Sequence, residues 1–322
     1  MAGIYSPEQE KEIAYSLQKL HYSPVKYSYF GKGVARWFNY VARAKAQTGA
    51  KEIHVLENIL VLQKVGTFFD SLSAYGYRNF NIIDIGVGDG SPAYPIFQYL
   101  QYSKPRAGLR YNAIDISPDM LHAASKNIKE GFKVYGEHNL FDIESGGFAH
   151  ITKGLRRAGY GNLFMFLGST LGNMVDMHQV MVNIRKSMAE NDYFLLGVEL
   201  FNPKELGKVI REYYAAQAAF DLTFTALEYF GARRIDGEYR SSFNQKLSRV
   251  EGYFTPDKDI KLKIAGRQLI LKKGERIMLF RSVKFTPARL VGLLSEAGYR
   301  IEMLTTSYEN NYALVLAQPV LR

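Results

Sequence analysis

The stretch IIDIGVGDGSPAYPIFQYL, residues 82–100, decides the fold. Apolar residues around Asp84 predict a buried strand, and the apolar spacing after the glycines predicts a helix. Between the two lie Gly86, Gly88 and Gly90. Glycine suits that position because a Cβ would obstruct both a tight turn and a ligand lying against the backbone. The stretch therefore predicts a strand, a ligand-binding loop and a helix.

The sequence that follows repeats this order of strand and helix. Short apolar runs alternate with helical stretches from about residue 80 to residue 200, which is typical of an α/β fold with a doubly wound, mostly parallel sheet. A helix ending at Gly298 and two further strands should close the same sheet. The five runs are FNIIDIG (80–86), YNAIDIS (111–117), FKVYG (132–136), NLFMFLG (162–168) and YFLLGVEL (193–200).

The rest of the chain predicts a second, α+β domain. The N-terminal residues are rich in Tyr and Phe and have helical spacing, whereas the segment before the last helix gives a helical stretch and then alternating polarity, typical of an antiparallel sheet. We expect a Rossmann-like core of residues 66–199 and 286–322. Residues 1–65 and 200–285 should form a substrate-binding domain, with a lid over the strand ends.

Composition predicts a folded cytoplasmic protein without a metal centre. The chain of 322 residues has no cysteine, which excludes disulfides, thiolate nucleophiles and cysteine-ligated metals. Its six histidines lack the spacing of metal ligands. We expect no membrane partner, because no run approaches the ~18 apolar residues of a membrane span and the N-terminus lacks the order of a secretory signal.

The glycine spacing separates two classes of cofactor. A dinucleotide-binding fingerprint needs its third glycine at position 91, where this chain has Ser91. The glycines at 86, 88 and 90 instead resemble the loop of class I S-adenosylmethionine (SAM)-dependent methyltransferases. Asp115 ends the next strand, 31 positions after Asp84, where its carboxylate can accept hydrogen bonds from a ribose diol. We therefore expect SAM as the cofactor.

Three further positions complete the expected cofactor site. In GEHNLFDIE (136–144), Asn139 or Asp142 could bind the adenine amine, and Leu140 or Phe141 could cover the adenine ring; we assign Asn139 and Leu140 to the site. Ligands of an open parallel sheet bind beyond the carboxyl ends of the strands. Gly168, which follows the fourth apolar run, should accordingly lie at the floor of the same site.

The stretch FLGSTLGN (166–173), together with the glycine loop and Asp115, resembles the histidine-specific methyltransferase family over nearly the whole chain. The best-known members trimethylate the α-amine of histidine, and fungal relatives methylate a prenylated tryptophan. The resemblance implies N-methylation of an amino acid. It also implies that Asn173 and the lid residue Tyr213 hold the α-amino and carboxylate end of the substrate, and that Ser282 lies near the substrate side chain.

The chain departs from the family where the substrate side chain is bound. The histidine enzymes carry a glutamate two residues before that serine, and here the position is Phe280. An imidazole facing phenylalanine would lose its hydrogen-bond partner. The family's Tyr-Tyr-Pro-Thr-Arg stretch is replaced by YVARAKAQT (40–48), and from this helical region we expect Tyr40, with Trp37 beside it, to contact the substrate. An aromatic or apolar substrate is therefore predicted in preference to histidine.

These observations favour an N-methyltransferase that acts on the α-amine of a small amino-acid-like molecule. Methyl transfer from a sulfonium needs no covalent enzyme intermediate, so Asn173 and Tyr213 are expected to position the amine. Histidine Nα-methylation is one alternative. The net charge of +10 motivates an RNA-modifying enzyme as another, although Lys and Arg are dispersed. A non-catalytic binding protein is a third, and both a monomer and a homo-oligomer are compatible with the sequence.

Overall fold

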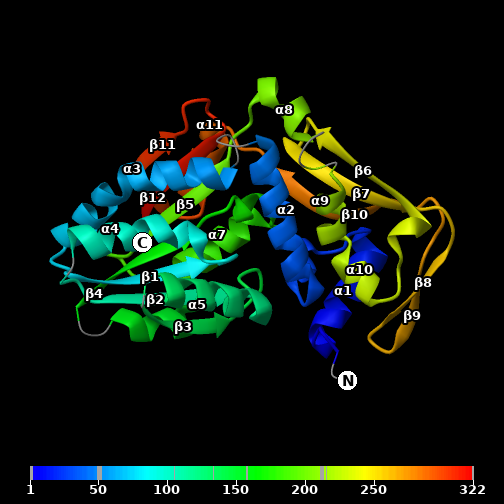
Figure 1. Ribbon diagram of the computed structural model, residues 1–322, viewed down its shortest axis with the longest axis horizontal. Coiled ribbons are helices and arrows are strands. Elements are labelled where there is room, and N and C mark those ends of the chain that lie inside the picture. Colours follow the sequence, from blue (N-terminus) through cyan, green and yellow to red (C-terminus); the bar gives the residue numbers. More distant parts are fainter. Residues whose placement is uncertain are drawn as a thin grey trace. The chain divides into compact units, whose positions relative to one another are not determined.

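The chain divides into two compact units, which Figure 1 shows coloured along the sequence. The core unit contains Ala50–Asn202 and Lys284–Arg322, and the insertion unit contains Met1–Gly49 and Pro203–Val283. Residues 53–65, which the sequence analysis assigns to the substrate domain, lie in the core unit because they belong to the continuous helix α3 (Ile53–Ala74). The computed structural model describes residues 3–48, 53–104, 106–132, 134–156, 159–210, 214 and 216–320.

The core unit is built on one seven-stranded sheet with the order β11-β12-β5-β4-β1-β2-β3. The strands from β5 to β3 are parallel, and β12 pairs antiparallel with both β5 and β11. This arrangement confirms the predicted α/β class and the closing role of the last two strands. The strands are β1 (Asn79–Ile85), β2 (Leu109–Asp115), β3 (Tyr135–Leu140), β4 (Tyr160–Phe166), β5 (Tyr193–Glu199), β11 (Tyr299–Thr306) and β12 (Tyr312–Pro319).

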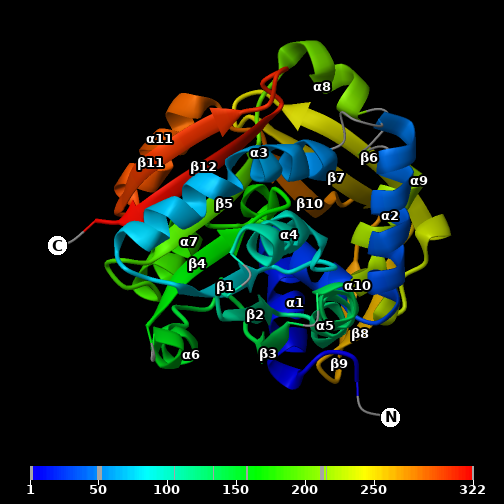
Figure 2. The ribbon, with the colours of Figure 1, turned by 60° about the vertical axis from the view of Figure 1, so that its left-hand side comes forward.

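Helices cover both faces of this sheet. Helices α3, α4 (Tyr94–Ser103) and α5 (Pro118–Phe132) lie on one face, and α7 (Met177–Lys186) and α11 (Pro287–Glu296) lie on the other (Figure 2). The central strands β4 and β5 are buried along nearly their whole length, which explains their continuous apolar runs. Shorter segments are η3 (Ser91–Ala93), α6 (Ala149–Thr152), η4 (Lys153–Arg156) and η5 (Thr170–Asn173).

The third strand differs from its predicted position. The run FKVYG predicts a strand from Phe132, whereas β3 begins at Tyr135 and Phe132 is the last residue of α5. The Phe132 ring packs at 5.0 Å from the Tyr94 ring and 5.3 Å from the Phe97 ring, so its apolar character serves the contact between α5 and α4.

The insertion unit combines helices with two small antiparallel sheets instead of the single sheet that the sequence predicts. One sheet has the order β10-β7-β6, and β8 pairs with β9 in the other. Strand β6 was not predicted because its sequence, GEYRSSFN, lacks apolar alternation, and it lies at an edge. The elements are α1 (Pro7–Leu20), η1 (Val25–Tyr29), α2 (Lys32–Thr48), α8 (Pro203–Val209), α9 (Gln217–Thr223), α10 (Thr225–Tyr229), η7 (Arg234–Asp236), β6 (Gly237–Asn244), β7 (Arg249–Pro256), β8 (Ile260–Ile264), β9 (Arg267–Leu271) and β10 (Ile277–Val283).

Local sequence signals explain how the helices begin. Ser6 caps α1 through a hydrogen bond from the Gln9 backbone N–H, and the Gln9 side chain accepts a bond in return from the Ser6 backbone N–H. Thr286 caps α11 in a similar way, through a bond from the Arg289 backbone N–H. None of the helices in the described parts of the chain is long and apolar enough to span a bilayer.

Candidate functional site

The loop after β1 has the backbone that its glycines predict. Gly86, Gly88 and Gly90 adopt positive φ angles of 64°, 55° and 78°, in the left-handed region that other residues rarely enter. A Cβ on Gly90 would lie 3.3 Å from the Ala124 carbonyl oxygen and 3.1 Å from Ile128 of α5. Glycine is therefore favoured by conformation at all three positions and by space at Gly90, and we call the Gly86–Gly90 backbone the glycine cradle.

Asp84 lies beneath this loop and not on its surface. Its side chain is buried, and the Tyr111 hydroxyl donates a hydrogen bond of 2.7 Å to its Oδ2. The pKa of Asp84 is raised to about 8, mainly by burial and to a smaller extent by the charges of Glu57 and Asp115, while the Tyr111 bond opposes the shift. The carboxyl groups of Asp84, Asp115 and Glu57 thus lie close enough to interact, near the carboxyl ends of β1 and β2.

Asp115, the last residue of β2, fastens the glycine loop to the sheet. Its carboxylate accepts a hydrogen bond of 2.8 Å from the Ser117 backbone N–H, and the backbone of Val87 and Ile116 also bonds to it. Burial raises the pKa of Asp115 to about 6, although these bonds favour the ionised form. The side chain sits beside the loop, at the place where the ribose ligand is predicted.

Near the end of β3, Asn139 is the residue predicted to bind the adenine amine. The Asn139 Nδ2 atom is buried and has no hydrogen-bond partner in the described residues. Asp142, the alternative, is held in a turn in which its Oδ1 accepts a bond of 3.0 Å from the Glu144 backbone N–H. Leu140 is 62% exposed, so its side chain is accessible to an adenine ring. An orphaned amide and a glycine cradle fit a bound adenosine group.

The turn after β4 explains why a core strand stops in small and hydroxylated residues. Gly168 and Ser169 both adopt positive φ, 70° and 58°, and lead into η5. The Gly168 N–H donates a hydrogen bond of 2.8 Å to Glu57 Oε2 on α3. Ser169 Oγ accepts a hydrogen bond of 2.9 Å from the Glu199 N–H at the end of β5. Lys284 forms a buried ion pair with that Glu199, and burial lowers the pKa of the lysine.

Glu57 was missed by the sequence analysis. It lies in the run HVLENILVL (54–62), where a lone carboxylate among apolar residues was the available signal. The structure buries its side chain completely.

Asn173 stands at the end of η5, partly exposed, with no side-chain hydrogen bond in the described residues. A purely structural role for it would be to cap the next helix. The cap of α7 is instead Asp176, whose side chain accepts a bond from the Gln179 backbone N–H at 2.8 Å. The Asn173 amide is therefore available to a ligand.

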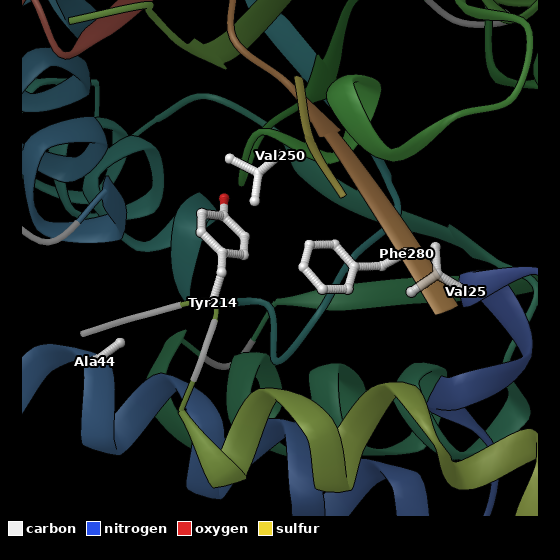
Figure 3. Packing of buried hydrophobic residues seen from close by; sticks show 5 residues of the cluster. All are labelled: Val25, Ala44, Tyr214, Val250 and Phe280. Atoms are coloured by element: carbon white, nitrogen blue, oxygen red, sulfur yellow. The ribbon is translucent and has the colours of Figure 1, made fainter. Parts of the chain in front are cut away.

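The insertion unit gathers the residues predicted to contact the substrate side chain. The buried cluster contains Val25, Ala44, Tyr214, Val250 and Phe280, and Figure 3 shows the Tyr214 and Phe280 rings side by side. The two rings are stacked, with centroids 5.4 Å apart. We call this group the aromatic cluster.

Two features fix the aromatic cluster. Phe280 pairs with Gly252 across β10 and β7, and a Cβ on Gly252 would lie 2.1 Å from Phe280 Cε1, so glycine leaves room for the ring. The Tyr214 hydroxyl donates 3.1 Å to Ser282 Oγ, and Tyr40 packs against the cluster. Phe280 and Ser282 thus both contact Tyr214, which the sequence analysis did not select, and Tyr40 packs against the same cluster.

Tyr213, the second predicted catalytic residue, lies outside the described residues. Within the described ranges, no group of three or more His, Asp or Glu side chains is arranged to hold a metal ion.

Two sequence comparisons match this chain to methyltransferases. The family model described as histidine-specific, SAM-dependent methyltransferase matches residues 24–319. A histidine N-alpha-methyltransferase of Mycolicibacterium smegmatis is 25% identical over 222 residues, which are 65% of this chain and 66% of the relative. The chain thus spans just under two thirds of that relative's length.

Solved structures give weaker likenesses. A SAM-dependent methyltransferase from Clostridium acetobutylicum matches with 9% identity and a TM-score of 0.44, over 80% of this chain and 91% of that one. A magnesium protoporphyrin IX methyltransferase from Synechocystis, with bound S-adenosylhomocysteine (SAH), matches with 12% identity and a TM-score of 0.46, over 92% and 98%. By the family match over most of its length, this chain belongs to the histidine-specific, SAM-dependent methyltransferases.

Proposed function

We propose that this methyltransferase acts on the α-amine of an amino acid or amino-acid-derived small molecule whose side chain is aromatic or apolar. The observation that carries the proposal is Phe280, in the aromatic cluster, at the position where the resemblance to histidine enzymes places a glutamate. The five buried residues of the cluster include no charged group. The one hydroxyl among them, that of Tyr214, already donates to Ser282.

These surroundings disfavour an imidazole and suit an apolar ring. A buried polar group without a hydrogen-bond partner costs about 1–3 kcal/mol, so an imidazole held against Phe280 would bind less well than an indole, phenyl or aliphatic group. Aromatic pairs also contribute about 0.5–1.5 kcal/mol beyond the area that they bury. The cluster offers two stacked rings for such a contact, Phe280 and Tyr214.

In the core unit, the residues suited to hold SAM are the backbone of Gly86–Gly90, the carboxylate of Asp115 and the orphaned amide of Asn139. SAM supplies an electrophilic methyl group on a positively charged sulfur. The carboxyl groups of Asp84 and Asp115 lie near the carboxyl ends of β1 and β2, where the Asp115 carboxylate, and Asp84 once it ionises, favour a cationic ligand.

The role of Asn173 in the proposal is to orient the amine. Its carboxamide oxygen can accept a hydrogen bond from the neutral amine and aim the nitrogen lone pair at the methyl group, while its NH₂ can donate to the substrate carboxylate. Alignment of this kind accounts for much of the rate in a displacement that forms no covalent enzyme intermediate.

The test is a competition of amino acids for methyl transfer. Purified protein, SAM with a labelled methyl group and single amino acids (tryptophan, tyrosine, phenylalanine, leucine or histidine) are incubated, and mass spectrometry measures the methylated products. We expect an aromatic or aliphatic amino acid, or a derivative found in cell extract, to give the highest kcat/KM. A higher kcat/KM for histidine would refute the preference and support the activity for which the M. smegmatis relative is named.

A matched pair of variants links the outcome to the aromatic cluster. Phe280→Leu keeps an apolar wall and should preserve the order of substrates. Phe280→Gln places a hydrogen-bonding amide there and should raise the kcat/KM of histidine relative to tryptophan. A binding measurement with RNA at low and high salt tests the alternative of an RNA-modifying enzyme, since RNA affinity that depends on basic residues falls steeply as the salt concentration rises.

A further inference from the structure

Glu57 and Tyr312 meet at the turn after β4. Glu57 is completely buried on α3, and its Oε2 accepts the Gly168 N–H at 2.8 Å and a bond from the Tyr312 hydroxyl of β12. A backbone hydrogen bond from Ser169 also reaches the Tyr312 hydroxyl. The two successive amides of the turn are therefore held by a carboxylate and a phenol that come from distant parts of the chain.

The sheet leaves a space for this pair of side chains. Gly197 of β5 lies beneath them, and a Cβ at that position would be 2.3 Å from Glu57 Oε2 and 2.4 Å from the Tyr312 hydroxyl oxygen. Any other residue at 197 would collide with both groups. Elements α3, β5 and β12 together thus enclose the buried Glu57 carboxylate.

The conformation of the turn after β4 explains why it needs hydrogen-bond acceptors at this place. Left-handed backbone costs roughly 1–2 kcal/mol at a residue with a Cβ, and here Ser169 follows Gly168 in that region. Buried amides also need acceptors, since the turn has left the ladder of the sheet. Glu57 and Tyr312 supply acceptors to the amides of Gly168 and Ser169, so they favour this conformation over an extended one.

The same turn contacts the cofactor loop. A Cβ on Gly86 would lie 3.4 Å from Thr170 Cγ2 and 3.6 Å from Phe166 Cε2, so the two loops are packed face to face. A displacement of the turn would therefore move both the floor of the cofactor cradle and Asn173, which lies three residues beyond Thr170.

We propose that Glu57 and Tyr312 are positioning residues for methyl transfer, which hold the amides of Gly168 and Ser169 and so fix the turn between the cofactor cradle and Asn173. The part that concerns Asn173 rests on the proposed function. The part that concerns the cradle does not, and it is tested with SAM and its demethylated product SAH alone.

The experiment compares Glu57→Ala, Glu57→Gln and a stability control, Leu72→Ala, which removes a fully buried side chain from the same helix. Hydrogen exchange followed by mass spectrometry reads the amides of residues 163–176, and calorimetry measures the affinities for SAM and SAH. Glu57→Ala should speed exchange of the Gly168 amide and lower the affinities for SAM and SAH by about 10-fold or more. Glutamine, whose Oε1 can still accept, should bring both readouts back to within about 3-fold of wild type.

The control separates positioning from general destabilisation. Leu72→Ala should lower the melting temperature as Glu57→Ala does, yet leave exchange at the turn and both affinities unchanged. If Glu57→Ala matches the control in exchange and affinity, or if glutamine fails to rescue, the proposal is overturned.

Tyr312→Phe provides a second measurement should the alanine variant not fold. It removes the acceptor of the Ser169 amide and the hydroxyl that donates to Glu57, but it keeps the Glu57 carboxylate that accepts from Gly168. Exchange should therefore rise at Ser169 and not at Gly168; equal protection of both amides would overturn the role of Tyr312. Because no amino-acid substrate enters these measurements, a failure of the substrate preference leaves their result unaffected.

Discussion

The buried carboxyl of Asp84 should make the stability of the protein depend on pH. Its ordinary pKa is 3.8, and burial raises the value in the folded chain to about 8. Between these values the folded protein holds a proton that the unfolded chain has released. The stabilisation is therefore complete below pH 4 and is lost as the pH rises through about 8.

The size of the effect follows from linkage. Over this range the free energy of unfolding falls by about 1.4 kcal/mol per pH unit for one such group, so Asp84 accounts for a loss of about 3 kcal/mol between pH 5 and pH 7. Asp84→Asn removes the titration but keeps an oxygen that can accept the Tyr111 hydroxyl. The difference in stability between wild type and variant should therefore change by that amount, because other titrating groups cancel.

The assay is urea unfolding at a series of pH values from 5 to 8, with both proteins measured side by side. Parallel curves for the two proteins would refute the account, since they would mean that Asp84 has the same pKa in the folded and unfolded chains. A bound cation should favour the ionised carboxyl. The affinity of wild type for SAM should accordingly rise from pH 6 to pH 8, and that of Asp84→Asn should rise less, because only Asp115, with its pKa of about 6, still ionises there.

Three further predictions concern other residues of the core unit. Asn173→Ala should lower the methylation rate about 100-fold with unchanged SAM affinity in calorimetry; equal loss of both would mean that Asn173 serves the fold. Gly90→Ala should weaken SAM binding about 10-fold, because alanine resists the left-handed backbone; wild-type affinity would contradict this. Lys284→Met should cost about 3–5 kcal/mol in urea unfolding by leaving Glu199 buried without its cation, and Lys284→Met with Glu199→Leu should recover part of it; no recovery would argue against a charge effect.

Sequence patterns predicted the elements whose signals are local. The glycine loop, the strand before it and Asp115 were found because apolar period and glycine spacing depend on adjacent residues. The third strand was predicted to begin too early because Phe132 is apolar. An apolar residue suits a contact between two helices, as here, as well as a place in a sheet. Edge strand β6 gave no signal because its residues are mostly polar.

Partners that are distant in sequence could not be predicted. Glu57 carries a signal only as a lone acid in an apolar helix, and nothing in that signal identifies the Gly168 amide as its partner. Tyr214 was overlooked among 23 tyrosines, of which the family resemblance selected its neighbour. Tertiary contacts of this kind depend on which elements the fold places together, and short-range patterns do not encode them.

The bond between Glu57 and Tyr312 joins residues 255 positions apart, and it has a consequence for how the protein is made. While the ribosome is still adding the insertion unit, β5 lacks its antiparallel neighbour β12, and the turn after β4 lacks the phenol. Pairings that close so long a loop form late, because the entropy of closure precedes any gain from contact. A nascent chain should therefore acquire its SAM affinity only after β12 has emerged, even though every residue of the glycine loop is synthesised in the first third of the sequence.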